Sequence, residues 1–505
     1  MKILLVNPPW IHKDRHGVRA GSRWPHLKIP EEEGYMPYPF FMGYATALLK
    51  THNFKAKAID AIAEGLSYKE FSKIVEEYKP DIVLSEVSTP SLEHDLGLLK
   101  KLKDKLNFKL VLAGPDDNIF SEKFLKSNKI VDFVLIGEYD STFLELCESL
   151  KNKRNIKNID GIIYRSGNKI IKTNKRELKK NLDMLPWPDR EDFPINKYHD
   201  CPGGIPEPSA QMWASRGCPF QCVFCLWPQI MYHGNSYRVR DVIDVVDEME
   251  YLVRKLGFKS IYFDDDTFNI GKSRMVKLAK EIRKRQLNIP WAFMGRADLS
   301  DEETLIELRK SGLYAVKYGM ESGVQKLVNN ANKNLDLKLA IKNILITKKL
   351  GIKVHLTFTF GLPGETKKTV QKTINLAKYL NPDSVQFSIL TPFPGTKFFD
   401  DMKKEGNIVS NNWQDYDGNT KSVIKTKQMS SVELKQAQDS AYSIWFDHKH
   451  LKQRYSKLSP ITLFNTCLKE HGLQFTFKKA LIYIKNHRYI NYFTNHKKEK
   501  ITMYV

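Results

Sequence analysis

The chain has few cysteines and no long apolar run, and each absence excludes a class of protein. Six cysteines in 505 residues are too few for the disulfide framework of a small secreted domain. No stretch approaches the roughly 18 apolar residues that a membrane span requires. The apolar start at residues 2–6 ends at Asn7 and Pro8, which is too short for a signal peptide. We therefore expect a cytoplasmic protein without a transmembrane segment.

The composition is that of a folded protein with a surplus of positive charge. Hydrophobic residues make up 42% and charged residues 27%, so wholesale disorder is excluded. At roughly 150 residues per domain, the length predicts about three domains. Lysine and arginine outnumber aspartate and glutamate by 80 to 58, a net charge of +22. A phosphate-rich partner, an anionic membrane surface and a merely lysine-rich surface remain open interpretations.

Residues 1–150 alternate short apolar runs with amphipathic stretches. The apolar runs lie at residues 2–6, 57–60, 81–85, 109–114 and 133–138. Helical patterns between them include residues 41–50 and 68–77. This alternation is typical of an α/β domain with a doubly wound, Rossmann-like parallel sheet. Because such sheets bind ligands at the carboxyl ends of their strands, we expect a cofactor there.

A proline-rich linker at residues 151–208 separates this domain from a second alternating series at 209–405. Its predicted strands are residues 211–215, 260–263, 291–296, 315–319, 353–360 and 384–390. Its predicted helices are residues 242–256, 273–285, 301–310, 337–350 and 367–380. Six β/α units predict a full or partial α/β barrel, with its active site at the C-terminal strand ends.

Residues 406–505 form a basic region for which the pattern predicts helices. Within it, residues 475–493 mix aromatic and aliphatic side chains with lysine and arginine. A packing helix with a solvated basic face is one interpretation of this segment. A helix lying on a membrane surface is the other, and it would make the protein a peripheral membrane protein.

Three cysteines within eight residues are the main chemical signal. Cys218, Cys222 and Cys225 follow the first predicted barrel strand on one tight loop, with no fourth cysteine nearby. An iron-sulfur cubane held by three thiolates keeps one iron open, whereas structural zinc takes four protein ligands. His233 could complete a Cys3His zinc site, which would make the protein a basic nucleic-acid binder without catalysis.

The cysteine spacing, with the aromatic Phe224 before the last cysteine, resembles the CxxxCxxC loop of the radical S-adenosylmethionine (SAM) superfamily. The resemblance implies a 4Fe-4S cluster whose open iron chelates SAM through its amino and carboxylate groups. One electron from the cluster then cleaves SAM to a 5′-deoxyadenosyl radical. A closed barrel suits this chemistry because it keeps water from the radical.

Further segments resemble the same family in its usual order, and the resemblance implies SAM contacts for each. They are Phe224, Asp264, Asp265, Asp266, Arg296, Glu321, Ser322, Gly361 and Gly364. The aspartates would hold the methionine ammonium group, Arg296 the carboxylate, Glu321 the ribose or amino group, and the glycines the adenine. Helix capping or binding of a divalent metal by the aspartates, an Arg296–Asp298 pair and a helix start at residues 364–366 remain alternatives.

A doubly wound domain ahead of this barrel resembles the cobalamin-binding class of radical SAM enzymes. The resemblance implies cobalamin contacts at Asn7, Pro8, Ser85, Val87, Gly114, Gly137 and Glu138. The DxHxxG motif that supplies histidine to cobalt elsewhere is absent, because Leu92 replaces its aspartate and His94 follows a different strand. We therefore expect base-off cobalamin without a histidine ligand. A domain that has lost the cofactor is the alternative.

The resemblance implies a cobalamin-dependent radical SAM enzyme that methylates an unactivated carbon. One SAM would remethylate cob(I)alamin, and a second would yield the radical that abstracts a substrate hydrogen. Cyclisation, rearrangement or oxidation with the same cofactors is the alternative outcome. Methylthiotransferases fit less well, because the first domain contains only Cys147. The expected partners are a small-molecule or lipid substrate and an electron donor such as flavodoxin or ferredoxin, whereas no side chain is singled out as catalytic.

Overall fold

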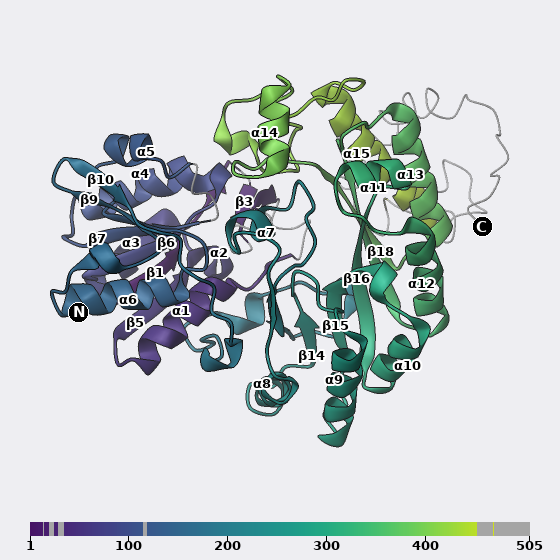
Figure 1. The fold of residues 1–505 in the computed structure, drawn as a ribbon, viewed down its shortest axis with the longest axis horizontal. Helices are drawn as coiled ribbons and strands as arrows, with labels where there is room; N and C mark the ends of the chain where they lie inside the picture. Colours follow the sequence, from purple (N-terminus) through teal and green to yellow (C-terminus); the bar gives the residue numbers. More distant parts are fainter. Residues whose placement is uncertain (14, 20–24, 29–34, 115–118, 452–467, 469–505) are drawn as a thin grey trace.

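The computed structural model describes residues 1–13, 15–19, 25–28, 35–114, 119–451 and 468. The helix predicted at residues 475–493 and its membrane interpretation therefore lie outside the described residues. Within them, no helix combines the length and the apolar character needed to span a membrane. Figure 1 shows two sheet-containing parts side by side, with C-terminal helices next to the second part.

The first part is a seven-stranded sheet of order β10-β9-β8-β7-β6-β1-β5. Its strands are β1 (Lys2–Asn7), β5 (Lys55–Asp60), β6 (Ile82–Glu86), β7 (Lys109–Ala113), β8 (Phe133–Leu135), β9 (Ile162–Ser166) and β10 (Lys169–Lys172). Its helices are α1 (Phe40–Thr51), α2 (Ala61–Glu64), α3 (Tyr68–Tyr78), α4 (Leu92–Lys103), α5 (Glu122–Ser127) and α6 (Asp140–Lys151). A small sheet of β2 (Ile11–His12), β3 (Arg15–Val18) and β4 (His26–Lys28) lies beyond β1 in sequence.

Alternation along the strands builds a core on each face of this sheet. Ile3 and Leu5 pack in the core that includes α1 and α6, whereas Leu4 and Val6 pack with α3, α4 and α5. The five strands β1 and β5–β8 pair in parallel. The predicted doubly wound parallel sheet is therefore confirmed.

The linker is shorter than the sequence predicts. Residues 162–172, which the prediction assigned to the linker at 151–208, form the hairpin β9–β10 and extend the first sheet in antiparallel fashion. The turn lies at Gly167, whose φ of 58° suits a residue without a side chain. Short edge strands carry a weaker periodic signal than central ones, and antiparallel edges on otherwise parallel sheets are common.

The second part is a six-stranded parallel sheet of order β11-β14-β15-β16-β17-β18. The strands are β11 (Ser209–Met212), β14 (Ser260–Phe263), β15 (Trp291–Gly295), β16 (Leu313–Glu321), β17 (Lys353–Phe360) and β18 (Ser384–Ile389). The helices are α7 (Leu226–Ile230), α8 (Val242–Arg254), α9 (Lys272–Lys284), α10 (Glu302–Lys310), α11 (Gln325–Asn330), α12 (Leu337–Lys349) and α13 (Lys367–Leu380). Because β11 and β18 are the two edges, the barrel is partial.

The first predicted barrel strand divides in two. β11 joins the barrel, whereas β12 (Ser215–Gly217) pairs antiparallel with β13 (Tyr237–Val239). The cysteines follow β12, so the loop that carries them belongs to this separate hairpin. The prediction of a single strand at 211–215 was wrong at its C-terminal end.

The C-terminal region contacts both parts of the chain. Its described helices are α14 (Lys397–Lys404) and α15 (Ser431–Phe446). The Tyr442 hydroxyl accepts a hydrogen bond from the amide of Phe387 in β18 at 3.0 Å, and Gln438 donates to the carbonyl of the same residue at 2.9 Å. A short 3-10 turn at Trp413–Asp415 contacts another at Thr89–Ser91 of the first part. The C-terminal region therefore bridges the two parts.

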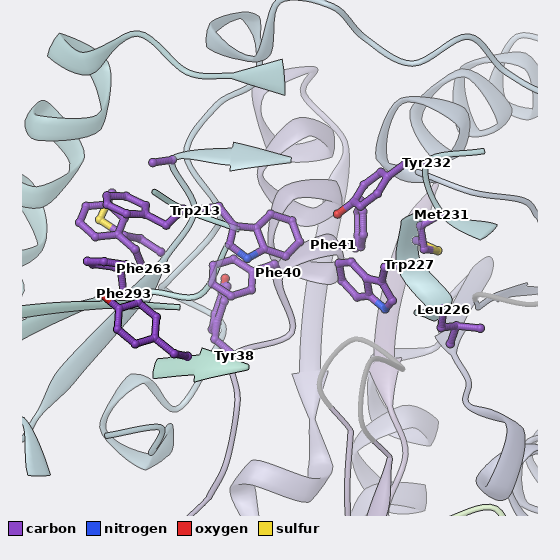
Figure 2. Close-up of a cluster of buried hydrophobic side chains, with 14 of the residues drawn as sticks. Tyr38, Phe40, Phe41, Trp213, Leu226, Trp227, Met231, Tyr232, Phe263 and Phe293 are labelled. Carbon is purple, nitrogen blue, oxygen red and sulfur yellow. The ribbon is translucent and has the colours of Figure 1, made fainter. Parts of the chain in front are cut away.

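Aromatic side chains fill the boundary between the two parts. Figure 2 shows Phe40 and Phe41 of α1 facing Trp213 and Trp227. The rings of Phe40 and Trp213 are stacked with centroids 4.2 Å apart, and those of Phe41 and Trp227 are 5.3 Å apart. Stacked and tilted pairs of this kind stabilise a packed interface beyond the area that they bury. The start of α1 and the segment around the cysteines thus share one core.

Candidate cofactor site

The cysteine loop is held by hydrogen bonds to its backbone. The side-chain amide of Gln229 donates to three carbonyl oxygens between Cys222 and Cys225, at 2.8 to 3.2 Å. From the segment that follows α11, Ala331 accepts from one loop amide at 3.0 Å, and Asn332 donates to a loop carbonyl at 2.8 Å. These contacts fix the loop backbone, and the Cys218 sulfur lies 3.3 Å from the Thr267 hydroxyl.

The thiols suit a cluster better than a single metal ion. Burial raises the pKa of Cys222 to about 11 and also raises the pKa of Cys218. Metal binding must therefore displace protons from these sulfurs. Among the described residues, no three Cys, His, Asp or Glu side chains gather as they would around one ion. A cubane gives each thiolate its own iron, so its ligands need not converge on one point.

The predicted zinc alternative is not formed by the described residues. His233 lies against the first part, since a Cβ added to Gly137 would come within 2.8 Å of its Nε2 atom. Structural zinc requires four donors at tetrahedral positions around one ion. Gly137, for which the resemblance implied a cobalamin contact, thus serves close packing of the two parts.

The acidic segment after β14 positions the chain just ahead of Cys218. The Asp265 carboxylate accepts from the amide of Ala214 and from the hydroxyl of Ser215. Asp266 accepts from the amide of Gly217 at 3.2 Å. Burial raises the pKa of Asp265 to about 6. The structure therefore gives both carboxylates contacts within the chain, and the carbonyl of Asp264 accepts from the Trp213 indole at 2.9 Å.

Arg296 forms an ion pair with Asp298, which was the predicted alternative to a contact with the SAM carboxylate. Its Nε and Nη2 atoms donate to the two oxygens of Asp298 at 3.0 and 2.7 Å. Its Nη1 atom donates to the carbonyl of Lys333 at 2.7 Å. The guanidinium carbon lies 3.8 Å from the centre of the Phe220 ring in the cysteine loop. This stacking positions the loop, and the guanidinium is largely occupied by partners within the chain.

A buried ion pair beside the cysteines was not predicted. Glu321 ends β16 with a φ of 61°. Its carboxylate accepts from the ammonium of Lys333 at 2.7 Å and from the hydroxyl of Thr359 at 2.8 Å. Burial lowers the pKa of Lys333, but the charges of Glu321 and Cys222 offset this effect, and the net shift is upward. No local sequence signal marks Lys333, because its partner lies on another element.

The remaining predicted SAM residues lie at strand ends. Ser322 lies 3.2 Å from the hydroxyl of Thr373 in α13, and Phe224 is half-buried against the core. Gly361 and Gly364 follow β17 with φ values of 95° and 90°, which a side chain would strain. The predicted helix start at residues 364–366 is confirmed, since Thr366 caps α13.

The strand ends of the first sheet carry a buried polar network. Asn7 donates to Asp60 at 2.9 Å and accepts from Arg19, whose guanidinium also reaches Asp95 at 2.6 Å. The Ser85 hydroxyl is buried without a hydrogen-bond partner among the described residues. A narrow crevice without room for a water molecule adjoins this network and is lined by Asn7, Arg19, Pro39, Met42 and Glu86. The orphaned hydroxyl fits a polar ligand at this edge.

The other predicted cobalamin residues differ in their surroundings. Pro8 and Val87 are buried at the same edge, and a Cβ on Gly114 would lie 2.8 Å from the Val87 carbonyl. His94 contacts the hydroxyl of Tyr68 at 2.5 Å. Glu138 is paired with Arg238 across the boundary, so its carboxylate joins the two parts.

Two arginines flank the cysteine loop and join it to the first sheet. Arg216, on β12, lies 2.8 Å from Asp140 and 3.4 Å from Glu138. Arg238, on β13, donates to Glu138 at 3.1 Å. All four side chains are at least nine-tenths buried. The hairpin that carries the loop is thus fixed to the start of α6.

The family comparison now decides the identity of the second part. Residues 214–377 match the family model of the radical SAM superfamily. This part of the chain is a radical SAM domain. The matched range begins just before β12 and extends through most of α13, so the radical SAM domain contains all three cysteines, Arg296 and Glu321.

Relatives of the chain align with nearly its whole length. An uncharacterized methyltransferase of Pyrococcus horikoshii is 29% identical over 483 residues, 95% of this chain and 97% of that protein. An anaerobic magnesium-protoporphyrin IX monomethyl ester cyclase of Rubrivivax gelatinosus is 26% identical over 470 residues, 90% of this chain and 79% of that protein. The solved structure of TsrM, a radical SAM methyltransferase from Kitasatospora setae with cobalamin and a 4Fe-4S cluster bound, has a TM-score of 0.65. At 15% identity over 97% of this chain and all of TsrM, that likeness shows a shared two-part fold.

Proposed function

We propose that this radical SAM protein is a cobalamin-dependent methyltransferase that acts on an unactivated carbon. One observation carries the proposal: the cysteine loop of the radical SAM domain is docked onto the strand-end side of a doubly wound domain. Arg216 and Asp140 form this connection, together with the aromatic contacts of Phe41 and Trp227. Two cofactors bound at these edges would face one substrate, which supplies proximity and excludes water.

The three thiolates of Cys218, Cys222 and Cys225 would hold the cluster. With SAM bound, the cluster would supply the electron for SAM cleavage, and cobalamin at the first sheet would supply the methyl group. Asp265 and Arg296 act on this site by positioning the chain before Cys218 and the loop residue Phe220. Asp264, Glu321 and the glycines after β17 are the proposed SAM contacts.

The cobalamin site would lie at the carboxyl edge of the first sheet. The buried Ser85 hydroxyl, which has no hydrogen-bond partner among the described residues, supports this placement. His94 contacts Tyr68, which agrees with the expectation of cobalamin without a histidine ligand. A small-molecule substrate and a protein electron donor complete the proposal.

A second outcome has its own support. The cyclase of Rubrivivax gelatinosus aligns with 90% of this chain, so the same architecture with cyclisation or oxidation as the reaction is the second candidate. The two candidates differ in the fate of the SAM methyl group. Methyl transfer forms S-adenosylhomocysteine, whereas a radical reaction alone forms 5′-deoxyadenosine.

The test uses anaerobically purified protein with reconstituted iron and sulfide, hydroxocobalamin and a strong reductant. Methyl transfer predicts that added SAM yields S-adenosylhomocysteine and the optical spectrum of methylcobalamin, together with 5′-deoxyadenosine. The variant Cys222→Ala serves as the control, and it should form no 5′-deoxyadenosine. Formation of 5′-deoxyadenosine without S-adenosylhomocysteine would favour the second candidate and contradict methyl transfer.

A further inference from the structure

Three neighbouring barrel strands carry apolar residues on one face and polar residues on the other. On β16, Val316, Tyr318 and Met320 are fully buried. We call the N-terminal end of the barrel interior the barrel floor. Beyond it, the residues of β16–β18 that point into the barrel are polar or glycine. All of them are half-buried except Glu321, which is buried. We call them the inner wall: Lys317, Gly319, Glu321, His355, Thr357, Thr359, Ser384, Gln386 and Ser388.

The register places the inner-wall residues in rows. Lys317, His355 and Ser384 are cross-strand neighbours. Thr357 stands beside Gly319 on one side and Gln386 on the other. The next row along the strands contains Glu321 and Thr359, which lie on the side of the cysteine loop. The rows therefore extend from the barrel floor toward that loop.

This pattern departs from the usual filling of a parallel barrel. Parallel strands are normally buried on both faces, and barrel interiors are filled by bulky branched side chains. The lower level here obeys the rule, since Ile205, Tyr262, Ala292 and Ala315 form a small apolar core. The turn at Pro202–Gly204 lies below it, where a Cβ on Gly203 would come within 2.9 Å of Ala315. Above this floor the apolar filling stops on β16–β18, whereas the neighbouring strand β15 contributes the half-buried Met294.

Several hydrogen-bonding groups of the inner wall are unused within the described residues. The Nδ1 atom of His355 bonds the Ser384 hydroxyl at 2.8 Å, but its Nε2 atom is buried without a partner. The side-chain amide of Gln386 donates to Ser388 at 2.9 Å, and its carbonyl oxygen accepts no hydrogen bond there. The Thr357 hydroxyl makes no side-chain hydrogen bond within the described residues. Buried polar atoms such as the His355 Nε2 atom normally have partners, so a ligand would complete it. The half-buried Thr357 and Gln386 side chains are accessible to the same ligand.

The charges near the inner wall are compensated within the chain. Lys317 lies 3.4 Å from Asp200, and Glu321 is paired with Lys333 at 2.7 Å. Burial, assisted by the charge of Lys317, lowers the pKa of His355 to about 3, so its imidazole is neutral near pH 7. The inner wall therefore offers neutral donors and acceptors rather than a free charge.

We propose that the inner wall below Glu321 binds the substrate, and that this substrate is uncharged and rich in hydroxyl, carbonyl or amide groups. This inference rests on the proposed function. A hydrocarbon at this position would leave Thr357, Gln386 and His355 unpaired, which is unfavourable. A phosphate or carboxylate would lack an unpaired cation. Sites built to bond a polar substrate strongly reject analogues without the matching groups.

The test follows the methyl group of SAM carrying three deuteriums. Reconstituted protein is incubated with an extract of the cells that encode it, and products are separated by phase partition and then by ion exchange. We expect the label in an aqueous product that neither an anion nor a cation exchanger retains. Label in the organic phase, or in an anionic fraction, would overturn the inference.

Two variants connect that product to the inner wall. Thr357→Val and Gln386→Leu should each lower label transfer at limiting extract by about tenfold, because a substrate hydrogen bond is lost. Formation of 5′-deoxyadenosine and the iron content should be retained. The matched control Gln371→Leu on the outer helix α13 should transfer label like the parent. Equal transfer by all three variants would overturn the inference, whereas failure of the purified parent to form methylcobalamin would instead contradict the proposed function.

Discussion

Arg216 and Asp140 join the two parts of the chain through a contact of 2.8 Å between Nη1 and Oδ2. Arg216 lies two residues before Cys218, and Asp140 is the first residue of α6. Their side chains are 2% and 4% exposed. The guanidinium also lies 4.5 Å from the centre of the Tyr44 ring in α1. The position of the three cysteines therefore depends on the neighbouring domain.

Replacing Arg216 should destabilise the protein and weaken cluster retention together. Arg216→Met leaves Asp140 and Glu138 buried with one fewer partner. Breaking a buried pair by removing one member costs about 3–5 kcal/mol. We expect a loss of unfolding free energy of that order, measured by urea denaturation, and faster loss of iron on gel filtration.

The exposed pair of Lys435 and Asp439 on α15 provides the control for that variant. Asp439→Asn should cost less than about 1 kcal/mol, as is usual for an exposed ion pair. Iron retention should be unchanged. Equal effects of Arg216→Met and Asp439→Asn would show that the Arg216–Asp140 contact adds no more to the unfolding free energy or to iron retention than a surface ion pair does.

Lys333 and Glu321 should behave as a coupled pair. Lys333→Met leaves the buried Glu321 carboxylate without its cation, whereas Glu321→Gln leaves the ammonium without its anion. Each single variant should lose several kcal/mol of unfolding free energy, and the double variant should lose clearly less than the sum. A double-mutant cycle measures this coupling, and additive losses would contradict the assignment of the pair.

The carboxyl of Glu86 predicts a pH dependence of stability. Burial raises the pKa of Glu86 to about 7 from an ordinary value of 4.5. Between these pH values the unfolded chain ionises while the folded chain keeps the proton, so stability falls as pH rises. Glu86→Gln should therefore gain stability relative to the parent by up to about 3 kcal/mol between pH 4.5 and pH 7.5.

Exposed Glu433 serves as the comparison, because its hydrogen bonds to Lys367 and Ser430 lower its pKa to about 2. Glu433→Gln should change the unfolding free energy by the same amount throughout that pH range. Urea denaturation at several pH values checks both variants. A constant difference between Glu86→Gln and the parent would show that Glu86 does not titrate as described.

The sequence predicts the central strands well, because their local signals agree. β17 spans Lys353–Phe360 as predicted, with alternating polar and apolar residues between Gly351 and Gly361. β14 also has its predicted bounds, Ser260–Phe263. Such strands have strong periodicity and glycines at their ends, and both are local properties of the chain.

The site was less predictable, since its contacts join distant segments. Arg216 and Asp140 are separated by 76 residues, and no spacing rule relates them. Asp265 and Arg296 matched a motif, yet their side chains mainly contact the chain itself. A motif identifies residues that a site needs, but only the packed structure shows whether a side chain touches a ligand or holds a neighbour.

The most direct test of the proposed function is the metal content of the protein, purified anaerobically with hydroxocobalamin supplied and then cleared of loosely bound cofactor. We expect about four irons and one cobalt per chain. The triple variant Cys218→Ala, Cys222→Ala, Cys225→Ala should retain cobalt and lose iron, because its thiolates are the cluster ligands. Zinc in place of iron in the parent protein, or iron retained by the triple variant, would contradict the central claim.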